Sequence, residues 1–158
     1  MSGYEFKVWV GCLACYNAGK LVGSWLDPAE GPDWACPNPT HEETWVFDHE
    51  GFGSKSEGSP QHFADLASEF EEAAEYGPVE AYLLYRANVG AQYATAEGFE
   101  ESYRGEWGSL QEYAEELFDE LYLHEIPEHL RSYIDYEKFA RDLECDGYWE
   151  ADGYVFEP

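Results

Sequence analysis

Three cysteines and a histidine near the N-terminus have types and spacing that suit metal binding. Cys12 and Cys15 form a C-x-x-C pair, and Cys36 and His41 follow in a proline-rich stretch. Zinc prefers thiolate and imidazole ligands, so these residues could complete a Cys₃His site. Cys36 and His41, however, lack the usual spacing of a zinc-ligand pair, and Cys12 and Cys15 lie at the end of a predicted strand. We interpret the thiols as reduced structural side chains and assign no metal or cofactor, but the sequence leaves zinc binding open.

No other group of residues marks a catalytic centre. The segment 14–21 contains Gly19-Lys20, but it lacks the first glycine and the Ser or Thr of a phosphate-binding loop. His124 and His129 are not spaced to place two ligands one helical turn apart. Carboxylate pairs for glycoside hydrolysis cannot be picked out among 34 acidic residues. We therefore expect no catalytic residues and no enzymatic activity.

The charge balance restricts the classes of partner. The chain has 34 Asp and Glu against 8 Lys and Arg, which gives a formal net charge of −26. Nucleic acids and anionic membranes would repel such a protein, so direct binding to either is not expected. The 44% content of hydrophobic residues allows a packed core, which argues against a disordered acidic tail. The expected partner is a basic protein surface.

The segment 109–121 predicts a helix with one apolar and one acidic face. Apolar residues recur at helical spacing from Leu110 to Leu121, and Ser109 with Glu112 forms a capping box. The outer face has no Lys or Arg, so five carboxylate pairs at i+3 or i+4 repel each other, at roughly 0.2–0.5 kcal/mol each. Its carboxylates are Glu112, Glu115, Glu116, Asp119 and Glu120.

A second helix, beginning at Ser59-Pro60, repeats this pattern. Its apolar stripe runs from Phe63 to Ala74, and again no Lys or Arg interrupts the acidic side. The carboxylates are Asp65, Glu69, Glu71, Glu72 and Glu75. Solvated helices usually intersperse Lys at i+4, which stabilises them, so two uncompensated faces in one chain suggest a function.

The spacing of these carboxylates suggests what that function is. Side chains at i and i+4 have Cβ atoms about 5–6 Å apart, a separation close to that of successive phosphates on a DNA strand. Proteins that bind DNA without sequence preference gain affinity by releasing counterions from a polyanion. A rigid carboxylate array offers such proteins the same gain. The two faces therefore predict a protein that imitates DNA.

The remaining elements predict an α+β fold with three small lobes. Residues 4–10, 21–26 and 44–48 alternate as strands of a small antiparallel sheet, with a turn at 17–19 and a loop over 27–43. Helices are expected over 79–87, 94–101 and 136–143, a turn over 127–133, and a hairpin at Asp152-Gly153. Glycine and serine residues from Gly51 to Ser59 predict a flexible joint.

These elements divide into an N-terminal β-rich domain, a helical acidic middle domain and a C-terminal α+β domain. Their predicted bounds are 1–52, 59–105 and 106–158. There is no signal-like N-terminal segment and no long apolar run, so we expect a protein of the cytoplasm with reduced thiols.

Two blocks of sequence resemble the ArdA family of antirestriction proteins. The segment 8–25 has the aromatic strand, the Tyr16-Asn17 pair before the turn and the Gly23-x-Trp25 after it. The segment 127–143 is similar to the C-terminal block of the family, and the aromatic hairpin at the end fits as well.

The resemblance implies an inhibitor carried by mobile DNA that mimics bent duplex DNA. It further implies that the protein occupies the DNA-binding channel of type I restriction-modification enzymes as an elongated homodimer without catalytic residues. Aromatic residues of the C-terminal lobe are candidates for the dimer contact: Tyr133, Tyr136, Phe139 and Trp149. The alternative is an acidic module that sequesters another basic, nucleic-acid-binding protein without DNA-like geometry.

Overall fold

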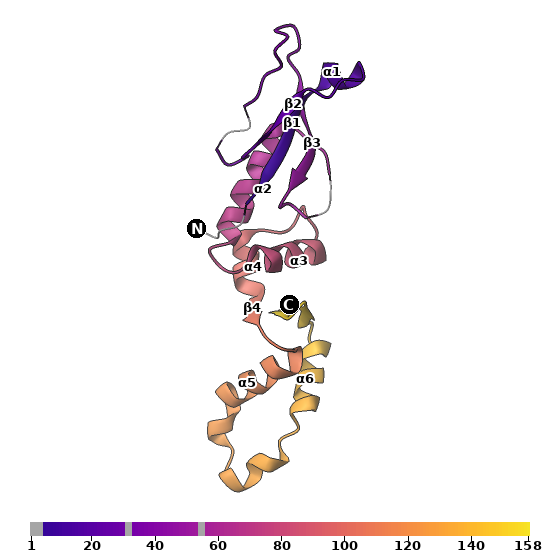
Figure 1. Ribbon diagram of the computed structural model, residues 1–158. Coiled ribbons are helices and arrows are strands. Elements are labelled where there is room, and N and C mark those ends of the chain that lie inside the picture. The colour runs from indigo at the N-terminus through magenta and orange to yellow at the C-terminus, as the bar shows by residue number, and fades with distance from the viewer. Residues whose placement is uncertain (1–4, 31–32, 54–55) are drawn as a thin grey trace. The chain divides into compact units, whose positions relative to one another are not determined.

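The computed structural model describes residues 5–30, 33–53 and 56–158 (Figure 1). The chain forms two compact units, Met1–Leu83 and Leu84–Pro158. Each unit combines a small antiparallel sheet with helices, so the predicted α+β class is confirmed. The division into three lobes stays a prediction. None of the helices among the described residues has the length and apolar character needed to cross a membrane.

The sheet of the first unit has the strand order β2-β1-β3, with both pairs antiparallel. Its strands are β1 (Lys7–Cys12), β2 (Gly23–Leu26) and β3 (Thr44–Glu50). The alternation predicts the buried face correctly, because Val8, Val10 and Val46 are fully buried. Tyr4, where we expected the first strand to begin, lies outside the described residues.

The short helix α1 (Leu13–Asn17) follows β1 directly, where only a turn was expected. Five residues are too few for a helical periodicity to show in the sequence. The turn itself is present at Gly19, whose φ of 84° suits glycine. The described residues between β2 and β3 contain no helix or strand, which agrees with the predicted loop.

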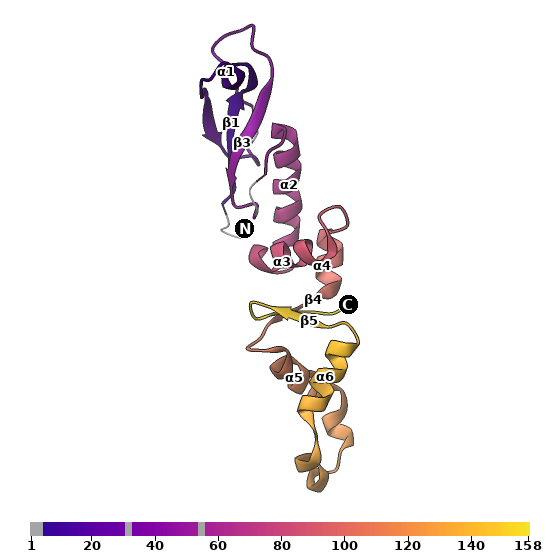
Figure 2. The ribbon, with the colours of Figure 1, turned by 90° about the vertical axis from the view of Figure 1, so that its right-hand side faces the viewer.

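Helix α2 (Pro60–Ala73) lies beside this sheet (Figure 2). Phe63 and Phe70 are fully buried, and both contact the ring of Phe52. Phe52 lies within the segment predicted as a flexible joint, of which Ser54 is outside the described residues. The prediction of a flexible joint was wrong at Phe52. The glycine and serine content of this segment did not indicate that one of its residues, an aromatic one, packs into the core. Phe6 of the N-terminal segment completes the cluster.

The predicted middle helices are confirmed as α3 (Val79–Val89) and α4 (Ala96–Ser102). The Thr95 side chain caps α4 by accepting a hydrogen bond from the Gly98 amide at 2.9 Å. The sheet of the second unit has the order β4-β6-β5, with β4 (Tyr103–Glu106), β5 (Trp149–Ala151) and β6 (Tyr154–Phe156).

The turn of the predicted hairpin has Asp152 at φ 51° and Gly153 at φ 87°, as expected for a two-residue loop. Strand β4 was not predicted, because its sequence Y-R-G-E is short and does not alternate. Its register with β6 is irregular. The segment is therefore identified as a strand by its pairing with β6 and not by its sequence.

The other elements of the second unit are α5 (Leu110–Tyr122), α6 (Tyr136–Cys145) and two 3-10 helices, η1 (Leu123–Glu125) and η2 (Glu128–Tyr133). The segment 127–133, expected as a turn, is thus the ordered helix η2. The core of this unit contains Tyr113, Ala114, Ala140, Leu143 and Val155. Leu121 belongs to the predicted apolar stripe of α5 but is 47% exposed, because the described chain leaves the end of this helix partly uncovered.

Candidate partner-binding surface

Nine of the ten predicted carboxylates lie on two helices, four on α2 and five on α5. Neither helix contains a Lys or Arg. Three of the ten are partly buried: Glu69, Glu115 and Asp119. The other seven are exposed: Asp65, Glu71, Glu72, Glu75, Glu112, Glu116 and Glu120. Glu75 follows the last residue of α2 in the turn after the helix.

The start of α2 is fixed by a side-chain cap and a proline. The Ser59 hydroxyl accepts a hydrogen bond from the His62 amide at 3.1 Å. Pro60 occupies the first helical position. A backbone N–H there would have no acceptor within the helix, so its absence from proline costs no hydrogen bond. The buried side of the helix is then set by Phe63 and Phe70. The acidic face therefore belongs to a helix held in place at its start and along its packed side.

The most exposed side of α2 carries its acidic residues. At 3.6 residues per turn, Asp65 and Glu72 lie opposite the side defined by Phe63 and Phe70. Asp65 accepts a hydrogen bond from the Gln61 amide nitrogen at 2.9 Å, which orients the carboxylate without neutralising its charge. This face presents a line of negative charge to the solvent.

Glu112 has a local structural role at the start of α5. The Ser109 hydroxyl accepts from the Glu112 amide at 3.2 Å, as predicted for the capping box. The Glu112 carboxylate, in return, accepts from the Gly108 amide at 2.9 Å rather than from Ser109. This carboxylate thus caps the helix, and its substitution would disturb the fold as well as the charge.

Asp119 is a second acidic residue with a structural partner. The Tyr136 hydroxyl donates a hydrogen bond to the Asp119 carboxylate at 2.6 Å. The Tyr136 ring also meets Phe118 edge-on, with ring centroids 5.6 Å apart. Tyr136, a candidate dimer contact, therefore joins α6 to α5 within one chain. The carboxylate of Asp119 is therefore bound within the chain.

We expect Tyr136→Phe to lower the free energy of unfolding by about 1 kcal/mol, because it removes this hydrogen bond and leaves the ring packed. The hydrogen bond to Asp119, followed by burial, raises the pKa of Tyr136 above its ordinary value. The stabilisation is therefore complete below the ordinary tyrosine pKa and is lost as the pH rises through the raised one. Urea unfolding at neutral pH measures the first effect.

The companion variant for Tyr136 is Asp119→Asn. It should bring the pKa of Tyr136 back towards its ordinary value, as followed by the ring carbon shifts in an NMR pH titration. An unchanged pKa in this variant would contradict the assigned hydrogen bond.

The other aromatic dimer candidates differ in exposure. Trp149 stacks on Phe156 with ring centroids 4.0 Å apart, and Phe139 meets Phe118 edge-on at 5.2 Å. Both rings are thus used within the chain. Tyr133, in contrast, is 81% exposed at the end of η2.

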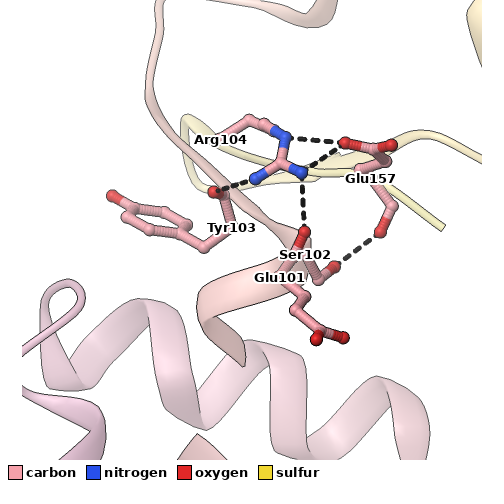
Figure 3. A network of polar contacts seen from close by, with 5 residues as sticks. All are labelled: Glu101, Ser102, Tyr103, Arg104 and Glu157. Atoms are coloured by element: carbon pink, nitrogen blue, oxygen red, sulfur yellow. Dashed lines mark hydrogen bonds and ion pairs between the residues drawn. The ribbon is translucent and has the colours of Figure 1, made fainter. Parts of the chain in front are cut away.

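Arg104, one of the few cationic residues, stabilises the fold of the second unit instead of neutralising the acidic faces. The sequence did not indicate this role. The Arg104 guanidinium binds the Glu157 carboxylate, with Nε donating to Oε2 at 2.7 Å (Figure 3). It also donates to the backbone oxygens of Tyr103 and Glu101, and the Ser102 hydroxyl donates to the backbone oxygen of Glu157. This network ties β4 and the end of α4 to the C-terminal segment.

The four potential metal ligands come together in the first unit. The sulfur atoms of Cys12, Cys15 and Cys36 lie 3.4, 3.5 and 3.6 Å from Nδ1 of His41. The Sγ atoms of Cys15 and Cys36 are 3.8 Å apart, and all four donor atoms lie within 4.8 Å of one another. The sequence placed these residues in two separate segments, and the fold makes them one cluster.

The thiols of this cluster influence each other's protonation. Burial raises the pKa of Cys12, but hydrogen bonds from Cys15, Cys36 and His41 outweigh it and lower the pKa to about 7. The pKa of Cys15 is raised to about 11 by its hydrogen bond with Cys12, by burial and by the neighbouring sulfur of Cys36. The first thiolate therefore forms on Cys12, and a second close beside it on Cys15 is disfavoured.

Comparison with known proteins supplies a family for this arrangement. The family model described as "Antirestriction protein (ArdA)" matches residues 8–156, which is nearly the whole chain. No curated protein matches.

Proposed function

Because the chain belongs to the ArdA family of antirestriction proteins, we propose that it inhibits type I restriction-modification enzymes by mimicking DNA. Family membership implies antirestriction activity and interaction with restriction enzymes. The proposed mechanism is that the carboxylates of α2 and α5 occupy the positions of DNA phosphates in the DNA-binding channel. Inhibition would then be stoichiometric and would need no catalytic residue.

The observation that carries this proposal is the exposure of unneutralised carboxylates on two well-anchored helices. Seven of the ten carboxylates are exposed, and neither helix supplies a Lys or Arg. The mutual repulsion of these groups destabilises the free protein, and a basic channel would relieve it on binding. Each displaced counterion adds entropy, as it does when the enzyme binds DNA itself.

The helices are anchored before any partner arrives. Phe63 and Phe70 fix α2 within the first unit, and Tyr113 and Ala114 fix α5 within the second. Binding therefore does not have to order these helices, so less conformational entropy is lost than for a disordered acidic segment. Because restriction enzymes act on intracellular DNA, we place the protein in the cytoplasm.

We also propose that the protein is a homodimer. Tyr133 is largely exposed at the end of η2, and three other large apolar residues of α5 and η2 are more than two-fifths exposed: Leu121, Tyr122 and Leu130. Covering an exposed aromatic side chain with a partner chain lowers the free energy of the system, which favours association. We expect Tyr133→Asp to shift the dimer towards monomer, measured by light scattering at micromolar concentration. The matched exposed variant Tyr93→Asp should leave the mass unchanged, and a monomeric wild type would refute the dimer.

A competition assay tests the proposed inhibition. A purified type I methyltransferase core is mixed with a labelled duplex carrying its site, and the protein is titrated in at several salt concentrations. We expect stoichiometric displacement of the duplex that weakens as the salt concentration rises. Failure of the folded protein to displace the duplex would overturn DNA mimicry for this enzyme class. Binding to the core without displacement would favour an acidic module that lacks DNA-like geometry.

A further inference from the structure

The cluster of Cys12, Cys15, Cys36 and His41 has a feature that hydrogen bonding does not explain. Nδ1 of the imidazole has either one proton or one lone pair, so it can form one good hydrogen bond. It nevertheless lies at nearly equal distances, 3.4–3.6 Å, from three sulfur atoms. Sulfur is a weak hydrogen-bond partner, so three such contacts offer little stabilisation. Equal contacts to one nitrogen indicate that the four atoms surround a common centre.

Four of the six distances between the donor atoms fit the edges of a zinc tetrahedron, and all six are within 4.8 Å. Zinc binds sulfur at about 2.3 Å and nitrogen at about 2.0–2.1 Å, so tetrahedral geometry places two sulfurs about 3.8 Å apart and sulfur about 3.6 Å from nitrogen. The Cys15–Cys36 sulfur distance is 3.8 Å, and the three sulfur–nitrogen distances are 3.4, 3.5 and 3.6 Å. A disulfide would instead require two sulfurs at about 2.05 Å, and all four cysteines of the chain are free thiols.

We propose that Cys12, Cys15, Cys36 and His41 bind one structural Zn²⁺ in a Cys₃His site. Three thiolates and one imidazole fill all four tetrahedral positions, so no position remains for water or substrate and the site is structural rather than catalytic. Soft sulfur ligands also favour zinc over Mg²⁺ or Ca²⁺, which take oxygen ligands. The inference concerns the first unit alone and does not depend on the proposed inhibition.

The backbone around the first two ligands prepares this site. Cys12 ends β1 and caps α1, and its sulfur accepts a hydrogen bond from the Cys15 amide at 3.4 Å. An amide donor stabilises the thiolate form, which is the form that binds zinc. The short helix α1 therefore brings the two sulfurs of the C-x-x-C pair to the same side.

The other two ligands belong to the loop between β2 and β3, which has no helix or strand among its described residues. Its internal hydrogen bonds are local, such as those from the amide and the hydroxyl of Thr40 to Oδ1 of Asn38. Zinc would tie this loop to β1 and α1 through Cys36 and His41. Closing a loop in this way stabilises the fold by restricting the unfolded chain.

The geometry also predicts a change at Asn38 on zinc loading. Its amide nitrogen lies 3.3 Å from Nε2 of His41. When Nδ1 binds the metal, Nε2 carries the ring proton, and two N–H groups cannot share a hydrogen bond. The contact must therefore lengthen, or the Asn38 amide must turn to present its oxygen.

Metal analysis of the full chain tests the site. The protein is stripped with a chelator under reducing conditions, titrated with Zn²⁺ against a chromophoric competitor, and analysed by mass spectrometry for metal content. We expect one tightly bound Zn²⁺ per chain and a higher thermal midpoint with zinc than after chelation. Co²⁺ in place of Zn²⁺ should give the intense visible bands of tetrahedral coordination with thiolate ligands. These measurements use the wild-type chain, so they do not depend on any variant folding.

Variants then assign the ligands. Cys36→Ser and His41→Ala should weaken zinc binding by more than about 100-fold, and His41→Cys should restore it as a Cys₄ site. The matched control is Cys145→Ser, which removes the exposed cysteine outside the cluster and should keep one zinc. The proposal is overturned if the reduced, folded wild type binds no zinc tightly, or if Cys36→Ser retains it with unchanged affinity.

Discussion

Neutralising five exposed carboxylates of the two acidic faces is expected to weaken inhibition of a type I enzyme by roughly 100-fold, at about 0.5 kcal/mol for each exposed charge contact. The variant carries Glu→Gln at Glu71, Glu72, Glu75, Glu116 and Glu120, all of which are exposed. It leaves Glu112 and Asp119 intact, because they cap α5 and bind Tyr136. The measurement is the inhibition constant in the competition assay at several salt concentrations.

The salt dependence is the more specific readout of this variant. If each of the five carboxylates replaces a phosphate contact, the slope of log affinity against log salt falls by about 0.9 for each one removed. Single substitutions should have little effect, because the binding energy is distributed over the array. A flattened slope together with the loss of affinity would identify the two faces as the phosphate mimic.

A control of equal charge separates the faces from overall acidity. Glu→Gln at five exposed positions outside α2 and α5 gives the same formal charge, since either set reduces −26 by five to −21. The control positions are Glu5, Glu30, Glu43, Glu50 and Glu150. Inhibition by the control should stay close to that of the wild type. Equal losses in both variants would mean that net charge, not the arrangement of carboxylates, carries the effect.

Phe156→Ala is expected to reduce the free energy of unfolding by about 3–5 kcal/mol, a large part of the 5–15 kcal/mol typical of a folded domain. Phe156 is fully buried in β6, the central strand of its sheet. It stacks on Trp149 and also contacts the rings of Tyr103 and Phe99. Truncation leaves a cavity among these rings, which cannot close fully because they belong to several elements.

Urea unfolding followed by tryptophan fluorescence measures this loss, because Trp149 reports on the same cluster. The control is Tyr93→Ala, whose side chain is 72% exposed and whose removal should change stability by less than about 0.5 kcal/mol. A loss below 1 kcal/mol for Phe156→Ala would contradict the packing described for this sheet.

The sequence by itself determined the features that depend on neighbours within a few residues. The caps at Ser59 and Ser109, the acidic sides of α2 and α5, and the hairpin at Asp152-Gly153 all follow from local spacing. Net charge and composition are likewise independent of the path of the chain. These features were sufficient to predict the α+β class and the location of the acidic faces.

Only the tertiary structure decided which distant residues meet. It brought Cys36 and His41 to Cys12 and Cys15, and it paired β6 of the predicted hairpin with β4, whose short segment carries no periodic signal. It also gave Asp119 a hydrogen-bond partner 17 residues away, which changes this carboxylate from a free surface charge to a bound one. Such contacts depend on how the elements pack and the chain closes its loops, and spacing along the sequence does not encode that path.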